Sequence, residues 1–342
     1  MKKILFFLVS LAIGTGLLIW TTRFIGWDEI KSAFQVFSFK AGMTILFLTI
    51  LASLIRAWRW KTILKSQGYN VRVLNALEYY LSGVAIAFFM PMVLLGGEIF
   101  RGYDLKEKYG MPWSKSIASV VIDRVLELTV YAIATIFGLI FFLTYTSLPS
   151  YRTGIIIFLA VFLVVALISL FYFKSYKRES IIHFFLKKFN AKGSNGADTA
   201  IEVEREVFQY FHPNKKLIWQ GLGLSLLVEL VLWARTFLLI LFLGKNIGVL
   251  LTFSILSFSS LALIFPIPAA LGSHDAVQSF VFTTLGLGAG TGAAFVLVIR
   301  GAELTLALIG LFFFFKFGAE RLQSLLLKKI GKLFNRRNSF HK

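Results

Sequence analysis

Residues 128–151 read LTVYAIATIFGLIFFLTYTSLPSY and contain no Asp, Glu, Lys or Arg. Residues 153–173 and 276–299 are free of charge in the same way. At about 1.5 Å per residue, each run is long enough as a helix to cross a hydrocarbon layer of about 30 Å. A chain inside lipid must satisfy its own backbone hydrogen bonds, so such runs are helices or barrel strands. Barrel strands alternate apolar and polar residues, and these runs do not. The sequence therefore predicts an all-α, polytopic membrane protein.

The composition of the whole chain agrees with a membrane protein. Hydrophobic residues make up 57% of the 342 residues and charged residues 15%, unlike the mix of a soluble domain. The formal net charge is +19. The basic residues cluster between the apolar runs and in residues 316–342, as the positive-inside rule predicts. We interpret this charge as an orientation signal and not as a nucleic-acid-binding surface. The chain has no Cys, which excludes disulfides and thiolate metal sites.

Eight apolar segments are candidate crossings, at residues 4–20, 41–60, 74–95, 116–143, 152–173, 217–243, 249–265 and 290–315. If the third segment crossed, the basic residues at 101–115 and 174–188 would lie outside the cell, against the positive-inside rule. If residues 74–110 and 249–288 instead enter and leave on one side, every basic cluster is cytoplasmic. We therefore predict six to eight transmembrane segments: six crossings and two re-entrant hairpins, with both termini in the cytoplasm. Residues 4–20 could alternatively be a signal peptide, but no small-x-small cleavage site follows them.

Both predicted hairpins carry helix-breaking residues where they should turn. Residues 90–97 read MPMVLLGG and residues 266–272 read PIPAALG. Pro and Gly interrupt helices, and interrupted helices are tolerated at membrane depth where protein or a water-filled cavity covers them. The alternative interpretation is a pair of ordinary kinked helices.

The two halves of the chain align without a gap at one constant offset, which takes position 124 to position 300. RVLELT at 124–129 corresponds to RGAELT at 300–305, Gly96 to Gly272, and Arg59 to Arg235. Matching Arg and Glu pairs are informative because charges inside membrane helices are rare. With three crossings between equivalent points, the halves would run in opposite directions through the membrane. The sequence thus predicts two inverted repeats, an architecture that recurs in transporters.

The repeats suggest a division of the chain into five parts. Residues 1–40 would hold the first transmembrane helix and an external interfacial helix, 41–174 membrane repeat 1, 175–216 a basic cytoplasmic linker, 217–317 membrane repeat 2, and 318–342 a basic cytoplasmic tail. The linker contains a predicted amphipathic helix, which we expect to begin at a capping box formed by Thr199 and Glu202. We expect its apolar face and that of residues 27–37 to lie on the membrane surface. These faces comprise Val203, Val207, Phe208 and Phe211, and Ile30, Phe34 and Phe37.

Charged residues in and after the hairpins are the candidate functional residues. Glu98 and Arg101 follow the first turn, and His274 and Asp275 follow the second. Each hairpin leads to a helix with Arg and Glu three residues apart, a spacing that allows them to pair. These pairs are Arg124 and Glu127, with Asp123 beside them, and Arg300 and Glu303; Glu229 and Arg235 lie within the sixth segment. Such groups must pair or face water. They are either structural salt bridges or substrate-binding groups, and for Glu98 and Arg101 a place at the headgroup level is a further alternative.

Three motifs in order resemble the lysylphosphatidylglycerol synthase transmembrane-region family, whose members are flippase-like membrane proteins. They are Gly96-Gly97-Glu98-Ile99-Phe100-Arg101, Asp123-Arg124-x-x-Glu127, and Pro266-x-Pro268-x-x-x-Gly272-x-x-Asp275. The similarity covers nearly the whole chain. The family's soluble aminoacyl-transferase domain is missing here, and the second turn departs from the usual Gly-rich turn followed by Glu.

The resemblance implies a lipid flippase-like transporter in the plasma (inner) membrane of a prokaryote. Its substrate would be an anionic or aminoacylated phospholipid, or a polyprenyl-phosphate-linked sugar. The substrate-binding candidates are Gly96, Gly97, Glu98, Arg101, Asp123, Arg124, Glu127, Arg235, Gly272, His274, Asp275, Arg300 and Glu303, because Arg binds phosphate in bidentate fashion and the carboxylates orient it.

No catalytic or metal-binding motif is present, and we expect no cofactor. Expected partners are membrane lipids, with a homo-oligomer and a separate lipid-synthesising enzyme as further candidates. The rival functions are an intramembrane lipid-modifying enzyme and a non-transporting membrane scaffold.

Overall fold

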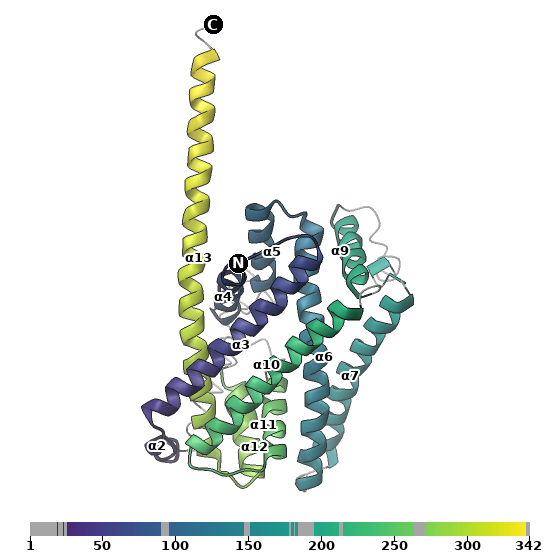
Figure 1. Cartoon of the computed structure of the whole chain (residues 1–342). Helices are drawn as coiled ribbons and strands as arrows, with labels where there is room; N and C mark the ends of the chain where they lie inside the picture. Colours follow the sequence, from purple (N-terminus) through teal and green to yellow (C-terminus); the bar gives the residue numbers. More distant parts are fainter. Residues whose placement is uncertain are drawn as a thin grey trace.

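The computed structural model describes residues 26–89, 96–146, 151–177, 195–211, 215–262 and 271–339, together with residues 19, 23, 179, 180, 182 and 183. All regular structure in these residues is helical (Figure 1). The predicted first crossing, at 4–20, falls almost entirely outside them, as do most of the two predicted turns.

Four of the described helices are long and apolar enough to cross a membrane. They are α3 (Phe39–Ser66), α6 (Trp113–Tyr145), α10 (Lys215–Phe242) and α13 (Ala289–Ser339). The 28 residues of α3 extend over about 42 Å. A fifth long helix, α7 (Tyr151–Lys177), exposes Phe158, Phe162 and other apolar side chains, as a helix that faces lipid would. The protein is an all-α polytopic membrane protein, as the charge-free runs predicted.

Four shorter helices form two hairpins. The first pairs α4 (Val73–Phe89) with α5 (Gly96–Tyr109), and the second pairs α11 (Val249–Ala262) with α12 (Ser273–Thr284). Even the 17 residues of α4 reach only about 26 Å, which is short of the hydrocarbon thickness. In each hairpin the second helix returns along the first (Figure 1). This arrangement matches the prediction of re-entrant hairpins and disagrees with kinked helices.

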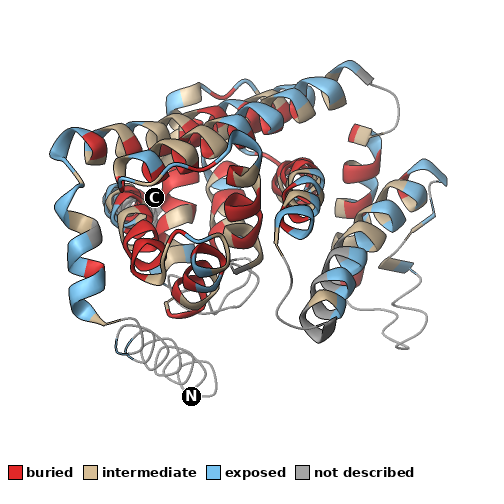
Figure 2. Cartoon of the chain, turned by 90° about the horizontal axis from the view of Figure 1, so that it is seen from below, coloured by how far each residue is buried: buried red, intermediate tan, exposed pale blue. Residues whose placement is uncertain are grey.

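The structure repeats itself at the predicted offset. The separation in sequence between the first residues is the same for α3 and α10, for α4 and α11, and for α6 and α13. Equivalent helices run in opposite directions: α3 rises in Figure 1 where α10 descends, and α6 descends where α13 rises. The packing is exchanged in the same way, because α4 lies on α13, α11 lies on α6, and α3 lies on α10. Each repeat thus completes the other, and Figure 2 shows the buried residues gathered where the repeats meet.

Two glycines permit the exchanged packing. A Cβ added to Gly138 in α6 would collide with the Phe253 carbonyl of α11. A Cβ added to Gly310 in α13 would collide with the Leu81 carbonyl of α4. Glycine is needed at both crossings because the two backbones approach too closely for any side chain.

The two predicted interfacial helices pack on the chain itself, so the expectation that their apolar faces meet the membrane surface was wrong. In α2 (Trp27–Gln35), Ile30 is 3% exposed and Glu29 accepts a hydrogen bond from the Gly290 N–H at 3.0 Å. This carboxylate lies at the N-terminus of α13, where the helix dipole favours negative charge.

The linker helix, α9 (Asn195–Phe211), buries its apolar face in a cluster with Ile122 and Leu126 of α6. Val207 is 2% exposed and Phe208 is 9% exposed. The helix begins at Asn195, four residues before the predicted cap at Thr199. An amphipathic pattern shows that a face will be buried, but it does not distinguish lipid from protein as the covering surface.

Candidate functional site

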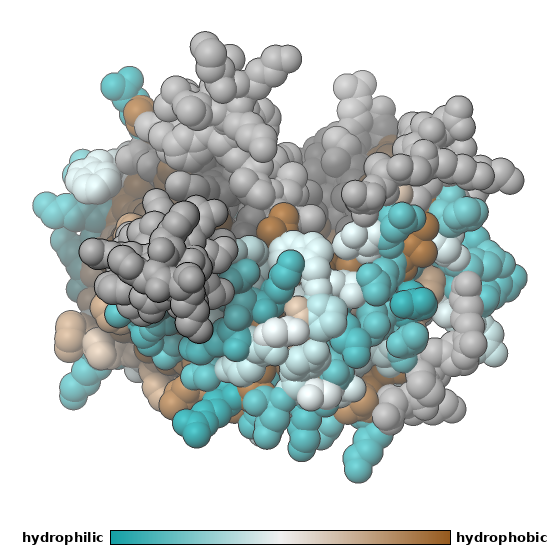
Figure 3. Space-filling view, turned by 90° about the horizontal axis from the view of Figure 1, so that it is seen from above, coloured by the Kyte–Doolittle hydropathy of each residue, from teal (hydrophilic) through white to brown (hydrophobic). Residues whose placement is uncertain are grey.

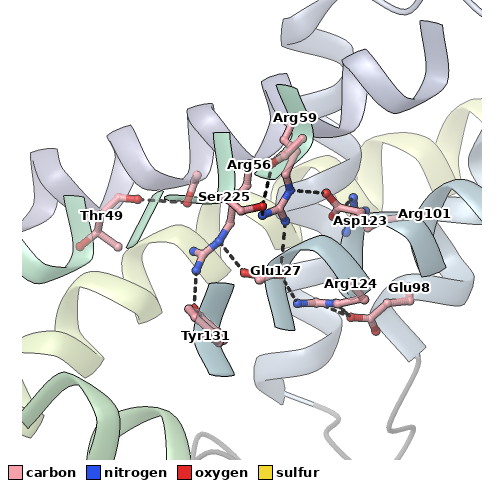
Figure 4. Close-up of polar contacts among 12 residues, drawn as sticks. Thr49, Arg56, Arg59, Glu98, Arg101, Asp123, Arg124, Glu127, Tyr131 and Ser225 are labelled. Atoms are coloured by element: carbon pink, nitrogen blue, oxygen red, sulfur yellow. Dashed lines mark hydrogen bonds and ion pairs between the residues drawn. The ribbon is translucent and has the colours of Figure 1, made fainter. Parts of the chain in front are cut away.

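A network of buried charged side chains lies in the first repeat, between α3, α5 and α6 (Figure 4). Its members are Arg56 and Arg59 from α3, Glu98 and Arg101 from α5, and Asp123, Arg124, Glu127 and Tyr131 from α6, with Ser225 from α10 in contact. Spacings of three and four residues place the charged groups of α3 and of α6 on facing sides of their helices. Asp123 lies about 15 Å along α6 from its first residue, so the network is deep within the bundle.

Asp123 joins two arginines that are almost fully buried. Its Oδ1 accepts a hydrogen bond from Arg59 Nε at 2.7 Å, and its Oδ2 accepts one from Arg101 Nη2 at 3.2 Å. The side-chain exposures are 1% for Asp123, 0% for Arg59 and 2% for Arg101. Arg101 is therefore buried within the protein.

Glu127 accepts hydrogen bonds from three arginines. Arg56 Nε approaches Oε1 at 2.9 Å, while Arg124 Nη1 at 2.8 Å and Arg59 Nη2 at 3.4 Å approach Oε2. Arg56 also donates to the Tyr131 hydroxyl at 2.9 Å. The predicted pairing of Arg124 with Glu127 is confirmed. The carboxylate, however, is shared by three arginines, two from α3 and one from α6.

Aromatic rings hold the guanidinium group of Arg101. It lies 4.1 Å from the centre of the Trp60 ring and 5.2 Å from that of Tyr80. The Trp60 Nε1–H donates to Ser119 Oγ at 3.2 Å, which fixes the ring. Cation–π contacts of this kind compensate a desolvated cation in part, so Arg101 can remain charged in an apolar setting.

Arg124 is the arginine of the network that an outside group can reach. Its side chain is 42% exposed, against 15% or less for Arg56, Arg59 and Arg101. It donates through Nε to Glu98 Oε1 at 2.8 Å, and Glu98 is 14% exposed. Among the described residues, four guanidinium groups share three directly hydrogen-bonded carboxylates, Glu98, Asp123 and Glu127, so these groups together carry one formal positive charge in excess. The network is suited to receive an anion at its Arg124 edge.

The second repeat contains a smaller set of charged groups. Arg300 Nη2 donates to Asp275 Oδ2 at 2.6 Å, and the same oxygen accepts the Gly272 N–H at 3.0 Å. Gly272 has φ of 75°, a conformation that favours glycine. Asp275 therefore caps α12 and binds α13 at the same time. This partner for Arg300 was not predicted, because it comes from a helix 25 positions earlier in the chain.

Arg235 shows how the repeats are related in atomic detail. Its Nη1 donates to Thr49 Oγ1 at 3.3 Å, and Arg59 Nη1 donates to Ser225 Oγ at 2.9 Å. Arg59 and Arg235 are equivalent at the repeat offset, and so are Thr49 and Ser225. The two hydrogen bonds are thus symmetric copies across the contact between α3 and α10. The symmetry ends there, since Arg235 Nε has no hydrogen-bond partner in the described part of the chain.

The remaining predicted site residues divide into electrostatic and packing groups. Glu303 is within electrostatic range of Arg235, Arg56 and Arg300. His274 is 5% exposed, and among the described residues its Nε2 has no hydrogen-bond partner. Gly96 begins α5, and Gly97 lies against the Gly83 backbone, where a Cβ would collide. Gly97 thus brings the helices of the first hairpin together.

Residue patterns missed part of the network. Residues of the network that were not predicted are Arg56, Arg59, Trp60, Tyr80, Tyr131 and Ser225. Two arginines three residues apart in the apolar helix α3 are nevertheless a usable signal. Within the described residues there is no group of three His, Cys, Asp or Glu side chains that could hold a metal ion.

Comparisons with known proteins agree with the motifs. A family model described as the lysylphosphatidylglycerol synthase TM region matches residues 7–310. The chain is 27% identical over 293 residues to a UPF0104 membrane protein of Methanocaldococcus jannaschii, covering 77% of this chain and 87% of that protein. It is 25% identical over 312 residues to one of Pyrococcus horikoshii, covering 84% and 88%. A third, from Methanothermobacter thermautotrophicus, is 21% identical over 284 residues, covering 80% and 82%.

Proposed function

This chain belongs to the lysylphosphatidylglycerol synthase transmembrane-region family, and we propose that it moves a lipid with a charged headgroup between the leaflets of the membrane. The candidate lipids are an anionic phospholipid, an aminoacylated phospholipid and a polyprenyl-phosphate-linked sugar. All three carry a phosphate, which is the group that arginine binds best.

The charged network of the first repeat is the observation that carries this proposal. Placing four arginines inside a membrane bundle, two of them almost fully buried, is unfavourable unless each is compensated. The three carboxylates bonded to them leave one positive charge in excess. A headgroup phosphate would supply the missing negative charge. It would enter at Arg124, which is 42% exposed, while Arg59 and Asp123 behind it keep the network in place.

The inverted repeats supply a route for movement. Transporters with this symmetry expose a central site alternately to the two sides when the repeats exchange conformations. Here the first repeat has a densely paired network and the second has a sparsely paired one.

The distribution of basic residues supports an orientation. The end of the molecule where α5 and α9 lie is mostly hydrophilic (Figure 3) and includes Lys106, Lys108 and Arg205. By the positive-inside rule, we place this end and both termini in the cytoplasm. The archaeal sources of the relatives support a prokaryotic plasma membrane.

Reconstitution tests the proposal. The full-length protein would be placed in liposomes with fluorescent phosphatidylglycerol, its lysylated form, or a polyprenyl-phosphate-linked sugar. A quencher that cannot cross the membrane would be added outside, and the loss of the protected inner-leaflet fluorescence would be followed. We expect the native protein to move at least one of these lipids. Arg124→Gln should slow movement at least about tenfold, because a hydrogen bond to a charged group contributes about 1.5–3 kcal/mol.

The control is Arg205→Gln on α9, an arginine that is 65% exposed and outside the network. It should transport normally. Native protein that moves none of the lipids would exclude the proposed function in favour of a scaffold. A chemically altered lipid recovered from the liposomes would favour the lipid-modifying enzyme.

A further inference from the structure

Glu229 is a buried carboxylate that the headgroup network does not use. It lies near the middle of α10 and is 4% exposed. Within the described part of the chain, no group donates a hydrogen bond to its Oε2. A carboxylate ion in this position would be strongly unfavourable, whereas a protonated carboxyl carries no charge to compensate.

The surroundings of Glu229 come from several helices. It is within electrostatic range of Arg56 of α3, Glu127 of α6 and Arg235 of its own helix, and Tyr131 of α6 is in range as well. Glu303 of α13 reaches the same arginines. The sequence of α11, which also packs on α10, contains no titratable residue. Where α9 meets α10, the contact is made by the Tyr210 hydroxyl, which donates to the Leu217 carbonyl at 3.2 Å.

The two arginines within electrostatic range of Glu229 have other partners in this state. Arg56 donates to Glu127 and Tyr131, and Arg235 donates to Thr49. An ionised Glu229 would draw one of these guanidinium groups toward it. If Arg56 moved, Glu127 would lose one of its three donors, so the change would reach the headgroup network directly.

The repeat symmetry makes Glu229 a distinct addition to the second repeat. The equivalent position in α3, at the same offset, is Ser53, whose hydroxyl donates to the Thr49 carbonyl at 3.1 Å. A small hydroxyl satisfied within its own helix is enough to fill this position. A carboxyl group there is therefore not needed for packing between α3 and α10.

Glu229 is buried, its Oε2 has no donor in the described part of the chain, and two arginines are within electrostatic range. From these observations we propose that Glu229 is a proton-binding site that couples lipid movement to a pH gradient. This inference rests on the proposed function. In the state described here Glu229 holds a proton taken from water on one side. When the repeats exchange conformations, the proton is released to water on the other side and the carboxylate pairs with Arg56 or Arg235.

Infrared difference spectroscopy tests the proton site without any transport. Full-length protein in phosphatidylglycerol and phosphatidylethanolamine liposomes would be compared at two pH values. We expect a carbonyl stretch of a protonated, buried carboxylic acid that disappears at the higher pH and is missing in Glu229→Gln. The control Glu202→Gln, on an exposed residue of α9, should keep the band. The same band in native protein and Glu229→Gln would overturn the proposal.

A transport measurement tests the coupling. In liposomes with an imposed pH gradient, native protein and Glu202→Gln should move fluorescent phosphatidylglycerol faster in one direction. Glu229→Gln should fold normally and move the lipid at one rate with or without the gradient. Native protein that moves lipid but ignores the gradient would overturn the coupling while leaving the proposed function standing. If native protein moves no lipid, the proposed function fails, and the infrared band alone decides whether Glu229 binds a proton.

Discussion

The two repeats share a backbone arrangement but differ in how their buried charges are satisfied. In the first repeat, Arg59 has both Asp123 and Glu127 as partners. In the second, the equivalent Arg235 donates to Thr49 and leaves Nε without a partner among the described residues. The residue equivalent to Asp123 is Ile299, which explains the difference. Duplication thus preserved helix packing, while the side chains at the centre diverged into one paired set and one sparsely paired set.

This difference shows which symmetric features depend on the backbone and which on chemistry. The exchanged contacts between α4 and α13 and between α6 and α11 are kept because each repeat would otherwise expose a hairpin. The charged groups are kept only in part. Arg59, Arg124 and Glu127 recur as Arg235, Arg300 and Glu303, but Ile299 stands where the first repeat has Asp123.

Among substitutions that test the difference between the repeats, we expect the largest loss of stability at Asp123. Replacing Asp123 with Ala leaves Arg59 and Arg101 without their shared partner in a site that is at most 2% exposed. Stranding a buried charge costs about 3–5 kcal/mol, so we expect a large loss of thermal stability in detergent. Asp275→Ala should cost less, since it leaves one arginine, Arg300, that is 10% exposed. Equal losses in the two variants, measured by thermal unfolding, would show that the repeats are equally paired.

The close crossings should respond alike in both repeats. We expect Gly138→Ala and Gly310→Ala each to destabilise the protein by about 1–3 kcal/mol, because the added methyl group collides with a backbone carbonyl of the other repeat. Gly223→Ala in α10 is the control, since a Cβ there meets nothing within 4 Å. That change should be neutral or stabilise the helix by about 0.5–1 kcal/mol. If only one of the two substitutions destabilises the protein strongly, the helix backbones approach closely at that crossing alone.

The fold was largely predictable from the sequence, and the site was predictable in part. Charge-free runs and the positive-inside rule predicted the long helices and both hairpins, because lipid constrains composition strongly. Arg124 and Glu127 were found by their spacing on one helix. Arg56 was missed because its partner Glu127 is 71 positions away, and no local pattern reports such a contact. The surface assigned to α9 was wrong because protein and lipid cover an apolar face equally well.

The structure also changes what a paired replacement of Arg124 and Glu127 would show. If they were an isolated salt bridge, replacing both with Leu would be nearly neutral. Because Glu127 also accepts from Arg56 and Arg59, the double replacement would leave two further arginines short of a partner. We expect it to destabilise the protein, so a loss of lipid movement in that variant would not identify a binding group. Arg124→Gln alone is the sharper change.

The smallest expected losses of stability come from two substitutions that each remove one of the symmetric hydrogen bonds. They compare the two repeats most directly. Ser225→Ala removes the bond from Arg59, and Thr49→Val removes the bond from Arg235. Arg59 keeps two carboxylate partners, so Ser225→Ala should cost less than about 1 kcal/mol. Arg235 is 7% exposed and already lacks a partner for Nε among the described residues, so Thr49→Val should cost about 1–3 kcal/mol.

Thr49→Ser keeps the hydroxyl and controls for the altered side-chain shape, so it should retain most of the stability. Thermal unfolding of the three variants in the same detergent gives the comparison. If Thr49→Val costs no more than Ser225→Ala, Arg235 has compensation that its counterpart does not need, and the second repeat is not the sparsely paired one. If the expected order is found, the arginine that is weakly held in this state is Arg235. It is then the group free to turn toward Glu229 or Glu303 when the repeats exchange conformations.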